Sequence, residues 1–69
     1  MDEHWEAIYQ CTTAYKAEIL KAILEENEIP CVVINKKDSS YLFGEIEIYV
    51  KQDNVLNAKQ IINRFEANE

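Results

Sequence analysis

Three side chains in the sequence are of the types that ligate soft metal ions. They are His4, Cys11 and Cys31, and imidazole and thiolate groups suit zinc or copper(I). A metal site requires these groups to converge. Cys11 ends one predicted strand, however, and Cys31 begins another that runs in the same direction, so the two thiols should lie near opposite ends of a sheet. We interpret both cysteines as buried or half-buried structural residues, and we expect neither a metal site nor a cofactor.

Side chains suited to acid–base or nucleophilic catalysis are scarce. The single histidine, His4, lies in an N-terminus predicted to fray, where a general base would not be held in position. Asp38, Ser39 and Ser40 resemble part of a nucleophile loop, but their composition is typical of a turn. The sequence therefore predicts no catalytic residues and a protein that is not an enzyme.

The segment 36–44 carries the candidate binding residues. Lys36 and Lys37 are the only adjacent basic pair in the chain, and they could contact a small anionic ligand. Tyr41 and Phe43 could pack on an apolar part of that ligand, or on a protein partner. The alternative is a hairpin connection whose apolar end tucks under the sheet.

The charge balance limits the classes of partner. The chain has 7 Lys and Arg against 13 Asp and Glu, a formal net charge of -6, which repels phosphate backbones and anionic membranes. RNA-binding sheets stack bases on aromatic side chains of their central strands, and Tyr49 is suitably placed. Glu45 and Glu47 nevertheless flank it where cations would be needed. We expect no nucleic-acid partner and no membrane partner.

The N-terminus also indicates the compartment. It is acidic where a signal peptide is basic, and it lacks the apolar run that such a peptide needs. No stretch approaches the roughly 18 apolar residues of a membrane span. The sequence therefore predicts a cytoplasmic protein whose two cysteines are reduced.

The stretch from Thr13 to Pro30 predicts one amphipathic helix, on which the other elements depend. The residues expected to face the sheet are Ala17, Leu20, Ile23 and Leu24, with Ile19 at the edge of this face. Thr12 or Thr13 could cap the first turn. Asn27 is expected to take the left-handed conformation at the helix exit, because Pro30 cannot continue the helix. A second candidate contact surface on this helix comprises Tyr15, Ile19 and Ala22.

Alternating apolar residues predict three strands. In residues 5–11, one face should carry Trp5, Ala7, Tyr9 and Cys11. In residues 31–37, one face should carry Val32 and Ile34. In residues 45–51, the inward face should carry Ile46, Ile48 and Val50. A second helix, capped by Asp53 or Asn54, should face the sheet with Val55, Ala58, Ile61, Ile62 and Phe65.

The resulting order, β-α-β-β-α, predicts one α+β domain over residues 1–69 with a core at about 5–66. A split β-α-β arrangement places the third strand between the first two, in a three-stranded antiparallel sheet with both helices on one face. This is a ferredoxin-like plait without its fourth strand. The edge that the fourth strand would cover is bare unless another chain pairs with it, so we predict a homodimer.

Several segments resemble the small bacterial domain of unknown function 2007. They are a short first strand ending near a threonine, the helix AEILKAILEENEIPC, the strand with Ile46, Ile48 and Val50, and the closing helix that begins DNVLNAKQII. The resemblance covers about residues 5–66 and implies a signal-transducing protein with a fold similar to the nitrogen-regulatory PII proteins. Family members usually have a glycine in a Gly-Ile-Pro-like step at the helix exit, where this chain has Glu28-Ile29-Pro30. The resemblance implies no catalytic residues.

These observations together predict a small regulatory domain that binds a small ligand or a protein partner without catalysis. The alternative is a protein–protein adaptor domain that has no small-molecule ligand. The two differ in what stabilises the protein, since only the first should respond to a metabolite.

Overall fold

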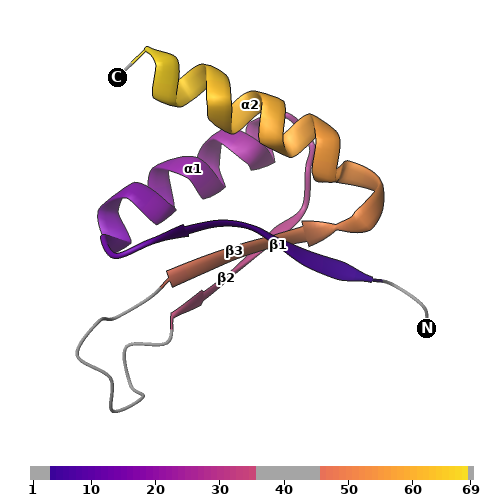
Figure 1. Ribbon diagram of the computed structural model, residues 1–69, viewed down its shortest axis with the longest axis horizontal. Helices are drawn as coiled ribbons and strands as arrows, with labels where there is room; N and C mark the ends of the chain where they lie inside the picture. Colours follow the sequence, from indigo (N-terminus) through magenta and orange to yellow (C-terminus); the bar gives the residue numbers. More distant parts are fainter. Residues whose placement is uncertain (1–3, 36–45, 69) are drawn as a thin grey trace.

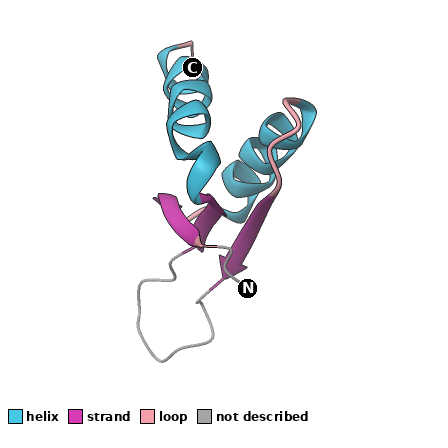
Figure 2. Cartoon of the chain, turned by 90° about the vertical axis from the view of Figure 1, so that its right-hand side faces the viewer, coloured by secondary structure: helices cyan, strands magenta, loops and turns pink. Residues whose placement is uncertain are grey.

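The chain folds into two layers, a sheet and a pair of helices that cover one of its faces (Figure 1). A computed structural model describes residues 4–35 and 46–68. In chain order the elements are β1 (Trp5–Cys11), α1 (Ala14–Glu26), β2 (Cys31–Asn35), β3 (Ile46–Lys51), the short 3₁₀ helix η1 (Gln52–Asn54) and α2 (Val55–Ala67). Figure 2 shows that the two helices splay apart as they rise from the sheet.

The sheet has the strand order β1-β3-β2, and β3 is antiparallel to both of its neighbours. The outer strands therefore run parallel to each other and are joined through α1. This arrangement confirms the predicted β-α-β-β-α order and the α+β class, and it is consistent with a ferredoxin-like fold. Within the described residues, no strand pairs with the outer edge of β1. In the same residues, neither helix is long and apolar enough to cross a membrane.

The core lies between the sheet and the two helices. Its buried members are Ala17, Leu20, Leu24, Ile29, Ile46, Ile48, Val50, Ala58 and Ile62. The inward face predicted for β3 is confirmed, because its three apolar residues are at most 1% exposed. The helix faces are also confirmed, although Ile23, Val55, Ile61 and Phe65 are only half-buried. Val55, Ile61 and Phe65 pack against the core at its margin. Ile23 instead lines a hollow together with Ile61 and Phe65.

A β-bulge in β1 corrects the predicted facing of that strand. Ala7 lies opposite Tyr49, but the next paired residue, Tyr9, lies opposite Ile48, so the register shifts at Ile8. A bulge inserts one extra residue, and every side chain after it changes face. The prediction that Trp5, Ala7, Tyr9 and Cys11 share a face is therefore wrong. Ile8, Tyr9 and Cys11 pack against the core, and Ala7 shares the uncovered face with Tyr49.

The exit of α1 corrects a second prediction, because Glu28, and not Asn27, takes the left-handed conformation. Glu28 has φ 63, whereas Asn27 has φ -95 and ψ 15. The backbone N–H of Ile29 donates to the carbonyl of Leu24 at 2.9 Å, and that of Glu28 donates to Glu25 at 2.9 Å. These two bonds form a Schellman motif, which requires the left-handed residue at the position of Glu28.

Asn27 has a different role, because its side chain satisfies a carbonyl of the last helical turn. Its Nδ2 donates to the carbonyl oxygen of Ile23 at 2.8 Å. At the helix starts, Thr13 and Asn54 occupy the predicted cap positions, but neither side chain forms a capping hydrogen bond. The sequence therefore located the helix ends correctly, although not the groups that satisfy them.

A polar cluster joins the first strand to both helices. The hydroxyl of Tyr9 donates to the carboxylate of Glu66 on α2, and Lys16 Nζ on α1 lies 3.3 Å from the same oxygen. Burial, followed by the hydrogen bond to Glu66, raises the pKa of Tyr9. The hydrogen bond from Tyr9, followed by that from Lys16, lowers the pKa of Glu66. This cluster links the end of β1 to the first turn of α1 and the last turn of α2.

Candidate functional site

The predicted ligand-contact residues Lys36, Lys37, Tyr41 and Phe43 lie outside the described residues. Their role stays a prediction. The second predicted surface, on α1, lies within the described residues. There Tyr15 is 74% exposed and Ala22 is exposed, whereas Ile19 is half-buried.

The candidate metal ligands do not converge. Cys11 lies opposite Ile46 and Cys31 lies opposite Val50, at the two ends of β3, and both thiols are free. Across residues 4–35 and 46–68, no group of three or more His, Cys, Asp or Glu side chains could hold a metal ion. Burial and the nearby Glu25 carboxylate raise the pKa of Cys31, which keeps this thiol protonated and therefore a poor nucleophile.

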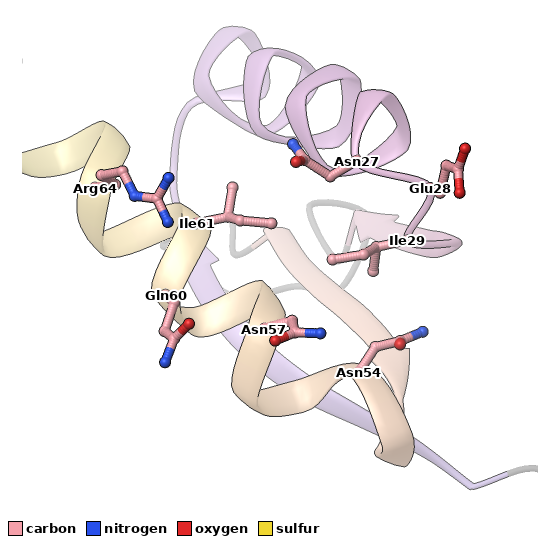
Figure 3. A pocket seen from close by; sticks show the side chains of 8 residues that line it. All are labelled: Asn27, Glu28, Ile29, Asn54, Asn57, Gln60, Ile61 and Arg64. Carbon is pink, nitrogen blue, oxygen red and sulfur yellow. The ribbon is translucent and has the colours of Figure 1, made fainter.

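The splayed helices border a polar hollow of about 390 Å³, which we call the α1–α2 groove (Figure 3). Its lining residues come from the exit of α1 and from one face of η1 and α2. They are Asn27, Glu28, Ile29, Asn54, Asn57, Gln60, Ile61 and Arg64. An adjoining hollow of about 250 Å³ shares Asn27, Ile61 and Arg64 and extends toward Asn68. The groove therefore runs along much of the length of α2.

The spacing of residues on α2 explains why polar side chains line this groove. Asn54, Asn57, Ile61 and Arg64 follow one another at intervals of three or four residues, so they form one stripe along the helix. This stripe adjoins the one that packs on the sheet, to which Ala58 belongs. Ile61 is half-buried at the boundary between the two stripes, where it forms part of the apolar floor of the groove.

Four polar side chains of the groove have no partner within the described residues, whereas the Asn27 amide donates to Ile23. Within the described part of the chain, the side chains of Asn54, Asn57 and Gln60 form no hydrogen bond, and Arg64 forms no ion pair. Each amide can both donate and accept, whereas the guanidinium only donates. Arg64 is also the only arginine of the chain. The groove can therefore bind a small polar molecule through several directional contacts.

Figure 3 shows the two charged groups of the groove on different elements and at different ends of it. Arg64 lies on α2, and Glu28 lies at the exit of α1. Asn57, Ile61 and Ile29 lie between them, with Ile29 only 5% exposed. Arg64 thus gives the groove a cationic end, and Ile29 and Ile61 give it an apolar floor. The Glu28 carboxylate lies at the rim and points outward (Figure 3).

The uncovered face of the sheet carries a second cluster of polar groups, centred on Glu47. Its carboxylate accepts hydrogen bonds from Gln10 Nε2 at 2.8 Å and from the Tyr49 hydroxyl at 2.7 Å, and the residue is only 7% exposed. Next to it, Val32 and Ile34 are 42% and 40% exposed. The Glu47 carboxylate is held by internal hydrogen bonds, whereas the two apolar side chains of β2 are partly exposed on this face and could contact a partner.

Sequence reasoning missed the groove, although two signals pointed to it. Asn is a poor helix former, yet Asn57 occupies the first turn of α2, where Ala or Glu would have the better intrinsic helix propensity. The only arginine lies seven residues further along, on the same face. Glu28 could not be assigned to the groove from the sequence, because its position depends on which residue at the exit of α1 takes the left-handed conformation.

Comparison with known proteins gives one match. Residues 5–66 match the model of the family DUF2007, whose description is "Putative prokaryotic signal transducing protein". No curated protein and no solved structure matches the chain significantly.

Proposed function

Because the chain belongs to this family, we propose that it is a non-catalytic regulatory domain that binds a small polar ligand in the α1–α2 groove. The observation that carries the proposal is the set of unpaired polar groups, Asn54, Asn57, Gln60 and Arg64, around a hollow of about 390 Å³. Small-molecule sites commonly have volumes of about 300–1,000 Å³.

The chemistry of the lining supports binding without turnover. Asn and Gln amides do not ionise near neutral pH, and an arginine does not lose its proton in proteins. Glu28 is the only carboxylate among the lining residues, and no histidine, cysteine or serine stands beside it as a nucleophile or second base. General acid–base and nucleophilic mechanisms need such a pair. The groove can therefore recognise a ligand but offers no evident means of converting it.

A ligand in the groove would contact both the exit of α1 and the length of α2. These two elements diverge above the sheet (Figure 2), so a molecule that bridges them would restrict their relative motion. A ligand that binds one arrangement of two elements more tightly shifts the population toward it. Lys36, Lys37, Tyr41 and Phe43 remain a proposed contact surface for a small anionic ligand or a protein partner.

Thermal unfolding across a compound panel tests the proposal. The panel contains nucleotides, 2-oxo acids, amino acids and divalent metals. A ligand present at 100 times its dissociation constant adds about 2.7 kcal/mol to the free energy of unfolding, which raises Tm by roughly 10–20 °C in a domain of this size. The shift should be lost in the Arg64→Gln variant and retained in Lys59→Gln, which removes an exposed charge from the same helix outside the groove. A flat response to every class would overturn ligand binding.

The adaptor function remains a second candidate. It is favoured by the exposed Val32 and Ile34 and by the outer edge of β1, with which no strand of the described residues pairs. Homodimerisation through this edge of β1 is a separate proposal, and it would supplement a small core. A dimeric mass in solution at tens of micromolar would support homodimerisation, and a monomeric mass would contradict it. An adaptor should also retain a protein partner in a pull-down that substitution of Tyr41 and Phe43 weakens, and should gain no stability from any metabolite.

A further inference from the structure

The charges of the α1–α2 groove narrow the class of ligand. We propose that the groove takes a short dipolar carboxylate of the peptide type, with its carboxylate on Arg64 and its amino end toward Glu28. This inference rests on the proposed function, because it assumes that the groove is a binding site. It specifies the chemical groups that the ligand must carry.

The carboxylate end follows from Arg64. A guanidinium matches the planar geometry of a carboxylate with two parallel N–H groups, and such charge-assisted hydrogen bonds are about twice as strong as neutral ones. Arg64 is the only cation among the lining residues, in a chain with a formal net charge of -6. One cation suffices for a carboxylate of charge −1. A nucleotide polyphosphate would bring more negative charge than this lining compensates.

The amino end follows from Glu28, which lies at the opposite end of the groove from Arg64 (Figure 3). Glu28 has φ 63, a conformation that Gly and Asn accept far more readily than Glu. Within the described residues, the Glu28 carboxylate forms no hydrogen bond and no ion pair. It can therefore bind the ammonium group of a ligand.

The middle of the groove fits the remainder of such a molecule. A peptide unit carries one N–H donor and one C=O acceptor, and the Asn54 and Asn57 amides can pair with both. Ile29 and Ile61 supply the floor on which an apolar part of the ligand would rest. An α-amino acid carries both of its charged groups on one carbon atom. In the groove, Asn57, Ile61 and Ile29 lie between Arg64 and Glu28 (Figure 3), which favours a molecule with at least one peptide bond between its charges.

The test is an NMR titration of the ¹⁵N-labelled protein with four probes, in which the amine and the carboxylate are blocked separately or together. These are glycylglycine, its N-acetyl form, its C-terminal amide, and the form blocked at both ends. Glycylglycine should shift the side-chain amide signals of Asn54 and Asn57 together with the Arg64 Nε–H signal. Blocking the carboxylate should weaken binding at least tenfold, since it removes a charge-assisted pair. Blocking the amine should weaken it by a smaller factor, and blocking both should abolish it.

Variants assign each end of the ligand. Arg64→Gln should remove the preference for a free carboxylate. Arg64→Lys should keep part of this preference, because the lysine ammonium retains the charge but cannot donate two parallel hydrogen bonds to a carboxylate. Glu28→Gln should remove the preference for a free amine while leaving the carboxylate preference intact. Lys59→Gln, the charge control on the exposed side of α2, should bind all four probes as the wild type does. A dispersed spectrum confirms that each variant is folded.

The outcomes separate this inference from the proposed function. Equal responses to all four probes, or none to any of them, overturn the dipolar carboxylate. If orthophosphate or AMP then shifts the groove signals, the ligand class is wrong and the groove remains a binding site. If no probe and no panel compound shifts them, both proposals fail.

Discussion

The two stripes of α2 differ in what they contribute to the protein. One stripe packs Ala58 and Ile62 into the core, where they are 0% and 4% exposed. The adjoining stripe presents Asn57 and Arg64 to the α1–α2 groove, and neither side chain has a partner among the described residues. The core stripe and the proposed binding stripe are thus separated by a rotation of about 100° on one helix, so substitutions on the two stripes should have different consequences.

The largest expected effect is that of Ile62→Ala compared with Ile61→Ala. These neighbours lose the same atoms, but Ile62 is buried and Ile61 is half-buried at the floor of the groove. A large-to-small change at a buried site costs about 2–5 kcal/mol, comparable with the roughly 3–5 kcal/mol that a core of this size supplies. Ile62→Ala should therefore be largely unfolded at 25 °C, whereas Ile61→Ala should lose only about 1 kcal/mol. Urea unfolding followed by circular dichroism measures the free energy of unfolding of both variants. Equal decreases would contradict the assignment of Ile62 to the core and of Ile61 to the groove.

The second prediction has the opposite sign. Glu28→Gly should raise the free energy of unfolding by about 0.5–1 kcal/mol, because glycine adopts φ 63 without steric cost, and Tm should rise by roughly 2–8 °C. Asn27→Gly is the matched control. It should destabilise, because it removes the hydrogen bond to Ile23 and gains no relief of strain. If Glu28→Gly is stabilising and also weakens glycylglycine binding, stability and recognition conflict at this residue.

A third prediction concerns the cluster of Tyr9, Lys16 and Glu66. Tyr9→Phe removes the hydroxyl that donates to Glu66 and should lower Tm by a few degrees at neutral pH. The pKa of Glu66 is lowered in the folded state, so its stabilising contribution is present above the unfolded pKa, about 4.3, and is lost as the pH falls through the folded value. The Tm difference between wild type and Tyr9→Phe should therefore shrink on acidification below about pH 4. A difference that does not change with pH would show that the carboxylate is not involved.

The smallest effect is expected on the outer surface of α1. Lys21 Nζ lies 3.2 Å from Glu25 Oε2, in an exposed i,i+4 pair. Pairs of this type contribute about 0.3–0.5 kcal/mol, so Lys21→Gln should lower Tm by no more than about 3 °C. The loss should disappear at high salt because the pair is exposed and screened. A loss as large as that of Ile62→Ala would mean that Lys21 has a structural role beyond this pair.

Apolar periodicity was sufficient to predict the architecture. The alternation of Ile46, Ile48 and Val50 identified the central strand, and the spacing of Ala17, Leu20 and Leu24 identified the inward face of α1. Burial of apolar area determines both patterns, so they can be read without knowledge of the neighbouring elements. The strand order then followed from covering one face of a sheet with two helices.

The two wrong predictions, on the facing of β1 and on the left-handed residue at the exit of α1, concern segments whose local sequence is compatible with two backbone arrangements. Ile8 interrupts the alternation of β1, and only pairing with β3 reveals that it is the extra residue of a bulge. At the α1 exit, Asn27 has the better intrinsic preference for a left-handed conformation, but the Schellman bonds require Glu28 to adopt it. The groove residues were missed because polar side chains carry no periodic signal that distinguishes a binding surface from a solvated one.

The bulge at Ile8 also affects how this protein can associate. It divides the outer edge of β1 into two short stretches, and a bulged strand is bent and more strongly twisted. A flat incoming strand can form a continuous ladder with only one of these stretches. An edge of this kind can accept one partner strand in a closed, symmetric pair, but it is a poor template for repeated strand addition. The irregularity that obscured the facing of β1 thus protects the chain against growth into fibres.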